Sequence, residues 1–437
     1  MTSAGSCRSC GHDGLEPILS LGQMPLANRL LLPAQLAEPE PRYPLDLAFC
    51  PSCALVQITE TVPPEILFHE YAYFSSFSDT MLQSVETLVG RLIRERALGP
   101  DSLAVEIGSN DGYLLQYYQR AGVPVLGIDP AVNVARVARE QRSIPTVAEL
   151  FDDTLAASLV AEGRQADVIH ANNVLAHVAN LNGVVRGISL LLKPSGVAVI
   201  ETPYVRDLVE RGEFDTIYHE HLCYYSLTAL TALFGRHGMV VRDVEQIPVH
   251  GGSLRLFVGK AAEATAGTSA ERGHQEVSAR VTELLRAERA AGLDRRAYYD
   301  GLAQKAVAIR RALQELLADL RARGKTVAAY GAAAKGAILL NYCGLGAESL
   351  AYVVDRNQYK QGRYLPGVRL PISGPERLLE QRPDYLLILV WNLTDEIVAQ
   401  QAAYRESGGR FIVPVPAPRI LDGPGGSVHA DQPDGSP

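Results

Sequence analysis

The segment Val105–Gly112, of sequence Val-Glu-Ile-Gly-Ser-Asn-Asp-Gly, constrains the fold of this chain more than any other. The apolar run around Glu106 predicts a buried strand. Gly108 and Gly112 then permit a tight turn and close backbone approach before a helix that begins near Tyr113. This strand, turn and helix are typical of a parallel sheet that opens a nucleotide-type pocket.

The glycine pattern is E-x-G-x-x-x-G and differs from the G-x-G-x-x-G of dinucleotide binders, which place a pyrophosphate on the helix N-terminus. It indicates a ligand without a pyrophosphate, for which we expect S-adenosylmethionine. A second apolar run, Val125–Ile128, ends in Asp129, whose carboxylate can accept both ribose hydroxyls. Asp129 before Pro130 is also consistent with a simple turn. The expected donor-binding residues here are Glu106, Gly108, Ser109, Asn110, Gly112 and Asp129.

Two more apolar runs, Ala166–Asn173 and Gly196–Glu201, alternate with helical patterns. The alternation predicts an α/β fold with a doubly wound parallel sheet, whose ligands bind at the carboxyl ends of the strands. Residues 267–323 have apolar residues at helical spacing and predict linking helices. Three later apolar runs, which begin at Thr326, Tyr352 and Tyr385, predict a second, Rossmann-like domain.

Length and charge narrow the class of protein. At 437 residues the chain should hold about three domains. Its formal net charge of −8 argues against nucleic acid or anionic lipid as a partner. Because neither a long apolar stretch nor a signal-peptide pattern occurs, we expect no membrane span and a cytoplasmic protein. Residues 422–437, rich in Gly, Pro, Ser and Asp, are expected to be a disordered tail.

Four cysteines form two C-x-x-C pairs, Cys7 with Cys10 and Cys50 with Cys53. Paired knuckles of this kind present four thiolates to a tetrahedral zinc ion, which leaves no open coordination position and indicates a structural site. A zinc ribbon that reads DNA is the alternative, but the segment between the knuckles has few basic residues. Cys223 and Cys343 are more typical of small buried residues than of nucleophiles.

Tyr218-His219-Glu220-His221 is the densest cluster of ionisable groups in the chain. Ser226 is expected to cap the helix that follows it. The cluster suits acid–base chemistry, because imidazole titrates near neutrality and a carboxylate can fix its tautomer. A second metal site is the alternative, although the spacing is not H-E-x-x-H. His177 and the aromatic run 71–77 are candidates for the same pocket; by default each is structural.

The chain resembles the S-adenosylmethionine-dependent sugar C-methyltransferases of deoxysugar biosynthesis, which act on nucleotide-linked 4-keto-deoxysugars. The resemblance covers nearly the whole chain and rests on blocks in fixed order. Besides the knuckles, these are Tyr71–Ser76 (Y-x-Y-F-S-S), Glu106–Gly112, Gly127–Pro130, Asn173–Val178, Tyr218–His221, His250–Arg255, and the C-terminal blocks that begin at Tyr330, Val354, Lys360 and Leu365.

The resemblance implies a class I methyltransferase domain flanked by a small N-terminal zinc-binding domain and a C-terminal Rossmann-like domain that helps to hold the nucleotide-sugar. We expect the domains at 1–66, 67–266, 267–323 (the linking helices) and 324–421, before the tail at 422–437. It implies a dTDP-linked sugar methylated next to the ketone, C3 being favoured over C5, and leaves open a monomer or a homodimer. It adds Asn173 to the donor site and Tyr71, Ser76, His250, Lys335, Arg356 and Asn392 to substrate binding.

A carbon next to a ketone loses a proton only if a base lies near it and a hydrogen-bond donor lies near the carbonyl oxygen. We assign the base to His221. By resemblance, Tyr218, Glu220, His177 and Tyr73 complete the pocket, and the choice of Tyr73 over Tyr71 depends on the alignment. An O- or N-methyltransferase, a non-catalytic zinc and nucleotide-sugar binding module, and an NAD-linked oxidoreductase are the competing functions. The last would need a G-x-G-x-x-G, which Gly331–Gly336 lacks.

Overall fold

The computed structural model describes residues 5–67, 76, 79–248, 251–261 and 276–421. The chain forms two compact units. One comprises Met1–Gly22, Leu45–Glu210 and His219–Leu302; the other comprises Gln23–Pro44, Arg211–Tyr218 and Ala303–Pro437.

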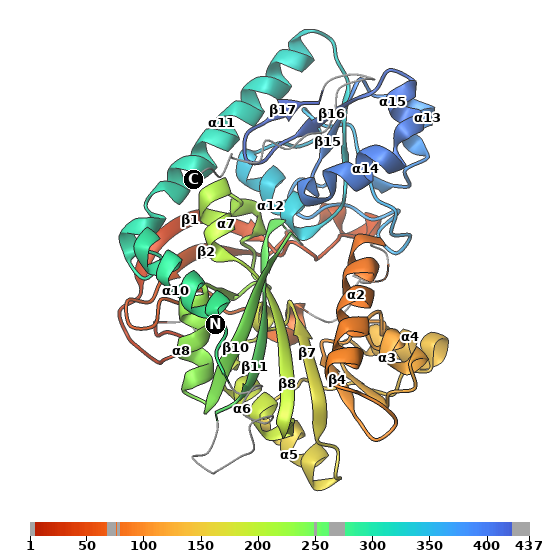
Figure 1. The fold of residues 1–437 in the computed structure, drawn as a ribbon. Coiled ribbons are helices and arrows are strands. Elements are labelled where there is room, and N and C mark those ends of the chain that lie inside the picture. The colour runs from red at the N-terminus through yellow and green to blue at the C-terminus, as the bar shows by residue number, and fades with distance from the viewer. Residues whose placement is uncertain (1–4, 68–75, 77–78, 249–250, 262–275, 422–437) are drawn as a thin grey trace. The chain divides into compact units, whose positions relative to one another are not determined.

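The first unit contains a seven-stranded sheet of order β10-β11-β8-β7-β4-β5-β6. β11 runs antiparallel to both of its neighbours, and the other pairs are parallel. Figure 1 shows β10, β11, β8 and β7 side by side. The predicted doubly wound sheet is confirmed. Its strands are β4 (Ala104–Ile107), β5 (Val125–Ile128), β6 (Thr146–Val147), β7 (Ala166–Asn172), β8 (Leu192–Pro203), β10 (Met239–Ile247) and β11 (Ser253–Lys260).

Helices connect these strands and cover the sheet. Because β4 is buried on both faces, it is apolar at nearly every position, as parallel strands between helical layers are. The predicted cap at Ser226 is confirmed, since its Oγ accepts a hydrogen bond from the backbone N–H of Ala229 at 3.1 Å. The helices are α2 (Asp79–Glu95), α3 (Leu115–Arg120), α4 (Val132–Arg142), α5 (Asp153–Ala161), α6 (Leu181–Leu191), α7 (Val205–Arg211), α8 (Leu227–Gly235) and α10 (Ala279–Ala291).

A smaller sheet, of order β1-β2-β3-β9, is built mainly from the N-terminal residues. Its strands are β1 (Glu16–Pro25), β2 (Arg42–Phe49), β3 (Val56–Ile58) and β9 (Cys223–Tyr224), and a short helix, α1 (Pro64–Leu67), follows β3. β9 comes from a distant part of the sequence, directly after the predicted catalytic cluster.

The second unit holds a six-stranded sheet of order β14-β13-β12-β15-β16-β17, parallel except for β17. This confirms the Rossmann-like domain. Figure 1 shows α13, α14 and α15 together on one side of it. Its elements are α11 (Gly301–Ala322), β12 (Val327–Tyr330), α12 (Ala334–Cys343), β13 (Val353–Val354), β14 (Ile372–Ser373), α13 (Arg377–Gln381), β15 (Tyr385–Ile388), α14 (Thr394–Gln400), α15 (Ala402–Glu406), β16 (Arg410–Val413) and β17 (Arg419–Ile420).

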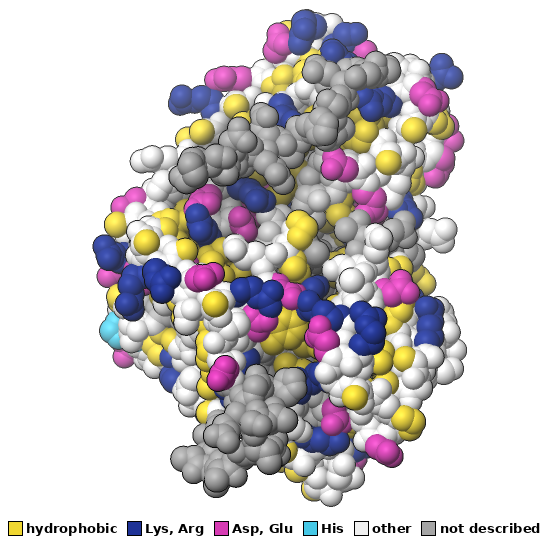
Figure 2. Space-filling model, in the orientation of Figure 1, with side chains coloured by type: hydrophobic (Ala, Val, Ile, Leu, Met, Phe, Trp, Pro, Cys, Tyr) yellow, Lys and Arg dark blue, Asp and Glu magenta, His cyan; other side chains and the backbone are white. Residues whose placement is uncertain are grey.

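Basic and acidic side chains are interspersed over the face of the molecule seen in Figure 2. Among the described residues, no helix is both long and apolar enough to cross a membrane.

Candidate active site and zinc cluster

The loop after β4 has the tight turn that its glycines predict. Gly108 adopts a φ of +67°, and a Cβ there would lie 2.7 Å from Cγ2 of Val174. Gly112 adopts a φ of +78°, and its Cβ would lie 2.5 Å from Cδ1 of Ile144. Both positions therefore require glycine for conformation and for space.

Asp129 fixes this loop from the end of the neighbouring strand, β5. Its Oδ2 accepts a hydrogen bond from the N–H of Asn110 at 2.8 Å, and its Oδ1 accepts one from the N–H of Ala131 at 2.9 Å. Burial raises the pKa of Asp129, and the two backbone hydrogen bonds oppose this rise. Each carboxylate oxygen keeps a second lone pair, so the side chain can still accept from a ribose hydroxyl.

Buried polar atoms without a partner collect at the carboxyl ends of β4, β7 and β8. Within the described residues, Oδ1 of Asn173 and both polar side-chain atoms of Asn172 lack a hydrogen-bond partner. Burial raises the pKa of the neighbouring Glu106 well above the ordinary value, and an interaction with the Tyr113 side chain opposes this rise. Buried polar groups are normally satisfied, so such a concentration fits a site completed by a polar ligand such as S-adenosylmethionine. The other side chains with unpartnered atoms there are Ser109 and Thr202.

Two of the predicted catalytic residues lie against each other. His177 ends the 3-10 turn Leu175–His177 after β7, and its ring centroid is 4.7 Å from that of His221 in an edge-to-face arrangement. Burial lowers the pKa of His177 to about 4, and a hydrogen bond with the backbone of Glu220 opposes this weakly. His177 is therefore neutral near pH 7. Glu220 is buried, whereas Tyr218 and His221 are half-buried.

The four knuckle cysteines converge. Their Sγ atoms all lie within 4.8 Å of one another, with 3.5 Å between Cys7 and Cys53 and 3.6 Å between Cys10 and Cys50. None of them forms a disulfide. Four thiolates at these separations fit a tetrahedral zinc ion with Zn–S bonds of about 2.3 Å.

In the second unit, Lys335 and Asn392 lie together. Nζ of Lys335 donates to Oδ1 of Asn392 at 2.7 Å and sits 4.5 Å from the ring centroid of Trp391. Nε1 of Trp391 donates to Oδ2 of the fully buried Asp215 at 2.8 Å. The sequence analysis did not identify Asp215 or Trp391 as site residues. The only sequence feature that distinguishes Trp391 is that it is the single tryptophan of the chain.

Of the remaining predicted substrate residues, the structure describes Arg356 and Ser76. Arg356 is partly exposed and lies 3.7 Å from Oε1 of Glu396. Ser76 is half-buried. Tyr71, Tyr73 and His250 lie outside the described residues.

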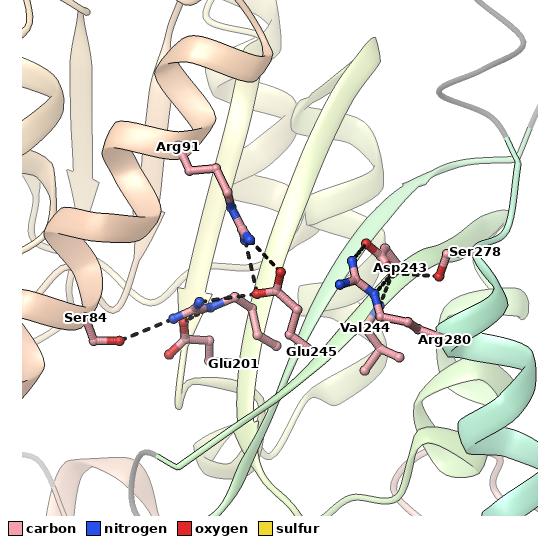
Figure 3. Close-up of polar contacts among 9 residues, drawn as sticks. Ser84, Arg91, Glu201, Asp243, Val244, Glu245, Ser278 and Arg280 are labelled. Carbon is pink, nitrogen blue, oxygen red and sulfur yellow. Dashed lines mark hydrogen bonds and ion pairs between the residues drawn. The ribbon is translucent and has the colours of Figure 1, made fainter.

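An ion-pair network with a buried pair at its centre joins α2 to the antiparallel side of the sheet (Figure 3). Nε of Arg255 donates to Oε1 of Glu201 at 2.6 Å, and both side chains are less than 10% exposed. Arg255 also lies 3.4 Å from Glu245, which accepts two hydrogen bonds from Arg91 of α2 at 2.6 and 3.0 Å. Sequence reasoning missed this network, although Arg255 closes one of the recognised motifs.

Three family models match successive parts of the chain: "Putative zinc binding domain" at residues 7–68, "Methyltransferase domain" at 82–244, and "C-methyltransferase C-terminal domain" at 248–416. The C-methyltransferase NovU of Streptomyces niveus is 37% identical over 415 residues, which are 95% of this chain and 96% of that protein. A ubiquinone biosynthesis O-methyltransferase of Methylobacterium sp. (strain 4-46) is 27% identical over 172 residues, 35% of this chain and 67% of that protein.

Among solved structures, magnesium protoporphyrin IX methyltransferase from Synechocystis PCC 6803 with bound SAM has a TM-score of 0.32 and 14% identity. This match covers 41% of this chain and 79% of that chain.

The strand order, the glycine loop and the cysteine cluster define a class I S-adenosylmethionine-dependent methyltransferase with an N-terminal zinc-binding domain and a C-terminal Rossmann-like domain. The chain belongs to the C-methyltransferase family that includes NovU. S-adenosylmethionine is its methyl donor, and zinc is its structural metal.

Proposed function

We propose that this enzyme methylates the carbon next to the ketone of a dTDP-linked 4-keto-deoxysugar, at C3 rather than C5, in the biosynthesis of a deoxysugar. The sugar and the nucleotide come from the family resemblance of the motifs. The reaction at carbon is supported by the extended similarity to a C-methyltransferase. The observation that most supports the proposed acid–base chemistry is the contact of His177 with His221.

In this proposal His221 is the base. It takes the proton from the carbon next to the ketone, and the electron pair of the broken C–H bond moves onto the carbonyl oxygen to give an enolate. His177 cannot share this role efficiently, because its lowered pKa of about 4 makes it a weak base. A neutral His177 remains able to orient the His221 ring.

S-adenosylmethionine, when bound, supplies the electrophilic methyl group that the enolate carbon takes up, while sulfur keeps the electron pair of its broken bond. We propose that Glu106, Gly108, Ser109, Asn110, Gly112, Asp129 and Asn173 hold it. The unpartnered Oδ1 of Asn173, the fully buried carboxyl of Glu106 and the backbone-bonded carboxylate of Asp129 support this set.

The remaining roles follow the resemblance. Tyr218 binds or polarises the sugar, Glu220 orients an imidazole, and Tyr73 completes the pocket. For the nucleotide-sugar, we propose Tyr71, Ser76, His250, Lys335, Arg356 and Asn392. The bonded pair of Lys335 and Asn392 supports a shared role for these two.

The His221→Asn variant tests the base. It should abolish methyl transfer to the keto-sugar and leave the dissociation constant for S-adenosylmethionine within twofold of the wild-type value. The His237→Asn variant is a matched control, because its imidazole also makes a hydrogen bond, to Asn182 at 2.8 Å, but has no role in the proposed chemistry. A near-normal rate in His221→Asn would remove His221 as the base.

A further inference from the structure

The backbone of Leu222, the residue after His221, is fixed on both sides. Its N–H donates to the carbonyl of Ala176 at 2.6 Å, and its carbonyl accepts from the N–H of Ile58 at 3.0 Å. Ala176 directly precedes His177, and Ile58 ends β3 of the N-terminal sheet. One residue therefore connects the segment that carries His221 both to the turn that carries His177 and to the sheet beside the zinc cluster.

This connection continues as a ladder. β3 pairs antiparallel with β9, with Gln57 opposite Cys223 and Val56 opposite Tyr224. The ring of Tyr224 lies edge-to-face with that of His221, with 6.2 Å between centroids. Leu222, Cys223 and Tyr224 are each at most 4% exposed, so the ladder hydrogen bonds are shielded from water.

Gln57 ties this ladder to the first zinc knuckle. Its side chain is fully buried; its Oε1 accepts from the N–H of Arg8 at 2.9 Å, and its Nε2 donates to the carbonyl of Ser6 at 3.3 Å. Both partners flank Cys7. The amide of Gln57 therefore holds the backbone of the knuckle against the strand that pairs with β9.

The side chain of Arg8 also links the first zinc knuckle to the end of β3. Its guanidinium donates to the carbonyls of Ile58 and Glu60 and, at 2.8 Å, to Oγ1 of Thr61. The planar fork of arginine suits such multiple acceptors, and lysine cannot reproduce it. Arg8 thus fixes the end of β3, where the hydrogen bond to Leu222 begins.

We propose that Gln57 and Arg8 are positioning residues for His221, so that the zinc knuckle and β3 act as a brace that sets the orientation of the predicted base. The choice of His221 as the base rests on the proposed function; the brace itself rests on the contacts above. Misplacement of a reacting group by about 1 Å can cost about 100-fold in rate, so a brace at this position affects turnover more than donor binding.

The test uses the Gln57→Met variant of the full-length zinc-loaded protein, since methionine has a similar length and cannot make either hydrogen bond. Tyr299→Phe is the matched control. Tyr299 is also fully buried, its ring packs against Phe49 of β2 at 5.3 Å, and its hydroxyl donates one hydrogen bond, to the carbonyl of Leu293 at 2.9 Å. The Tyr299→Phe variant therefore loses a buried hydrogen bond beside the N-terminal sheet, but this bond is not part of the brace.

Three quantities are measured: zinc content, the dissociation constant for S-adenosylmethionine, and the NMR signal of the His221 ring in protein with ¹³C-labelled histidine. The signal is assigned by its absence in His221→Asn. We expect Gln57→Met to keep its zinc and its donor affinity while the His221 signal and its titration midpoint shift, and Tyr299→Phe to match the wild type. If Gln57→Met loses zinc or unfolds, Arg8→Lys takes its place with the same expectation.

With the keto-sugar, the same variant should also lower kcat at least tenfold with little change in KM. An unchanged His221 signal in a folded, zinc-containing brace variant would overturn the inference. A wild-type protein that fails to act on the keto-sugar would instead refute the proposed function, and the NMR comparison would still decide whether the brace exists.

Discussion

The imidazole of His177 lies edge-to-face against that of His221, with 4.7 Å between ring centroids. The two residues reach this contact from different parts of the sequence, one from the turn after β7 and one from the irregular segment before β9. Because burial keeps His177 neutral at pH 7, the pair brings together one buried, neutral imidazole and one half-buried imidazole. That asymmetry supports the proposal that His221, and not His177, is the base.

Asp129→Ala should weaken binding of S-adenosylmethionine at least tenfold, which is about 1.4 kcal/mol. The variant loses the proposed ribose acceptor and the two backbone hydrogen bonds that fix the loop after β4. Isothermal titration calorimetry provides the dissociation constant. Asp153→Ala is the control, because Asp153 makes an exposed ion pair with Arg186, and its affinity should not change. Equal affinities for both variants would refute the role of Asp129.

Arg255→Lys should lower the free energy of unfolding by about 3 kcal/mol, because a buried ion pair loses the geometry that compensates its desolvation. Figure 3 offers a control, Arg280→Lys. Arg280 pairs with Asp243 at the surface, with a side chain 58% exposed, and the change should cost at most about 1 kcal/mol. Urea unfolding of both variants measures the difference. A similar small loss in the two would show that the buried network contributes no special stability.

His170 should make the fold sensitive to acid. It is fully buried, its Nε2 lies 2.9 Å from the hydroxyl of Tyr118, and burial lowers its pKa to about 3. Since the unfolded chain binds this proton near pH 6.5 and the folded chain does not, stability is present above pH 6.5 and falls as the pH drops toward 3. The contribution of one such group is about 1.4 kcal/mol per pH unit in that window.

His170→Gln retains a polar partner for Tyr118 and does not titrate. Its unfolding free energy, measured between pH 6.5 and 5, should therefore fall less steeply than that of the wild type, by about 1 kcal/mol per pH unit, because the unfolded histidine is only half protonated at pH 6.5. Equal slopes would contradict the assignment of a neutral buried His170.

Elemental analysis should find about one zinc per chain, and Cys50→Ser should reduce this below half. The Cys343→Ser variant tests specificity, because Cys343 is also buried but lies outside the cysteine cluster. It should keep its zinc. A well-folded, metal-free wild-type protein would contradict the zinc site.

The sequence predicts those parts of the fold whose signal is local. β4, β5 and β7 are apolar runs bounded by turn residues, and the cap at Ser226 follows from its own hydrogen-bonding chemistry. The cysteine cluster is equally predictable, because the knuckle spacing itself specifies the geometry.

Other contacts depend on tertiary structure and have no local signal. β3 and β9 have three and two residues, too few to show a period, yet they pair. Trp391 and Asp215 are 176 positions apart and meet only because the sheet of the second unit is formed. The same holds for Glu201 and Arg255, since cross-strand pairing depends on a register that the sequence pattern does not specify.

Carbon methylation through an enolate is tested most directly by mass spectrometry of a dTDP-linked 4-keto-deoxysugar incubated with the enzyme in heavy water. We expect one deuterium to enter the sugar without S-adenosylmethionine, one methyl group to be added with it, and both changes to vanish in His221→Asn. A methyl gain without deuterium uptake, at a site resistant to exchange, would contradict the enolate mechanism and favour methylation at oxygen.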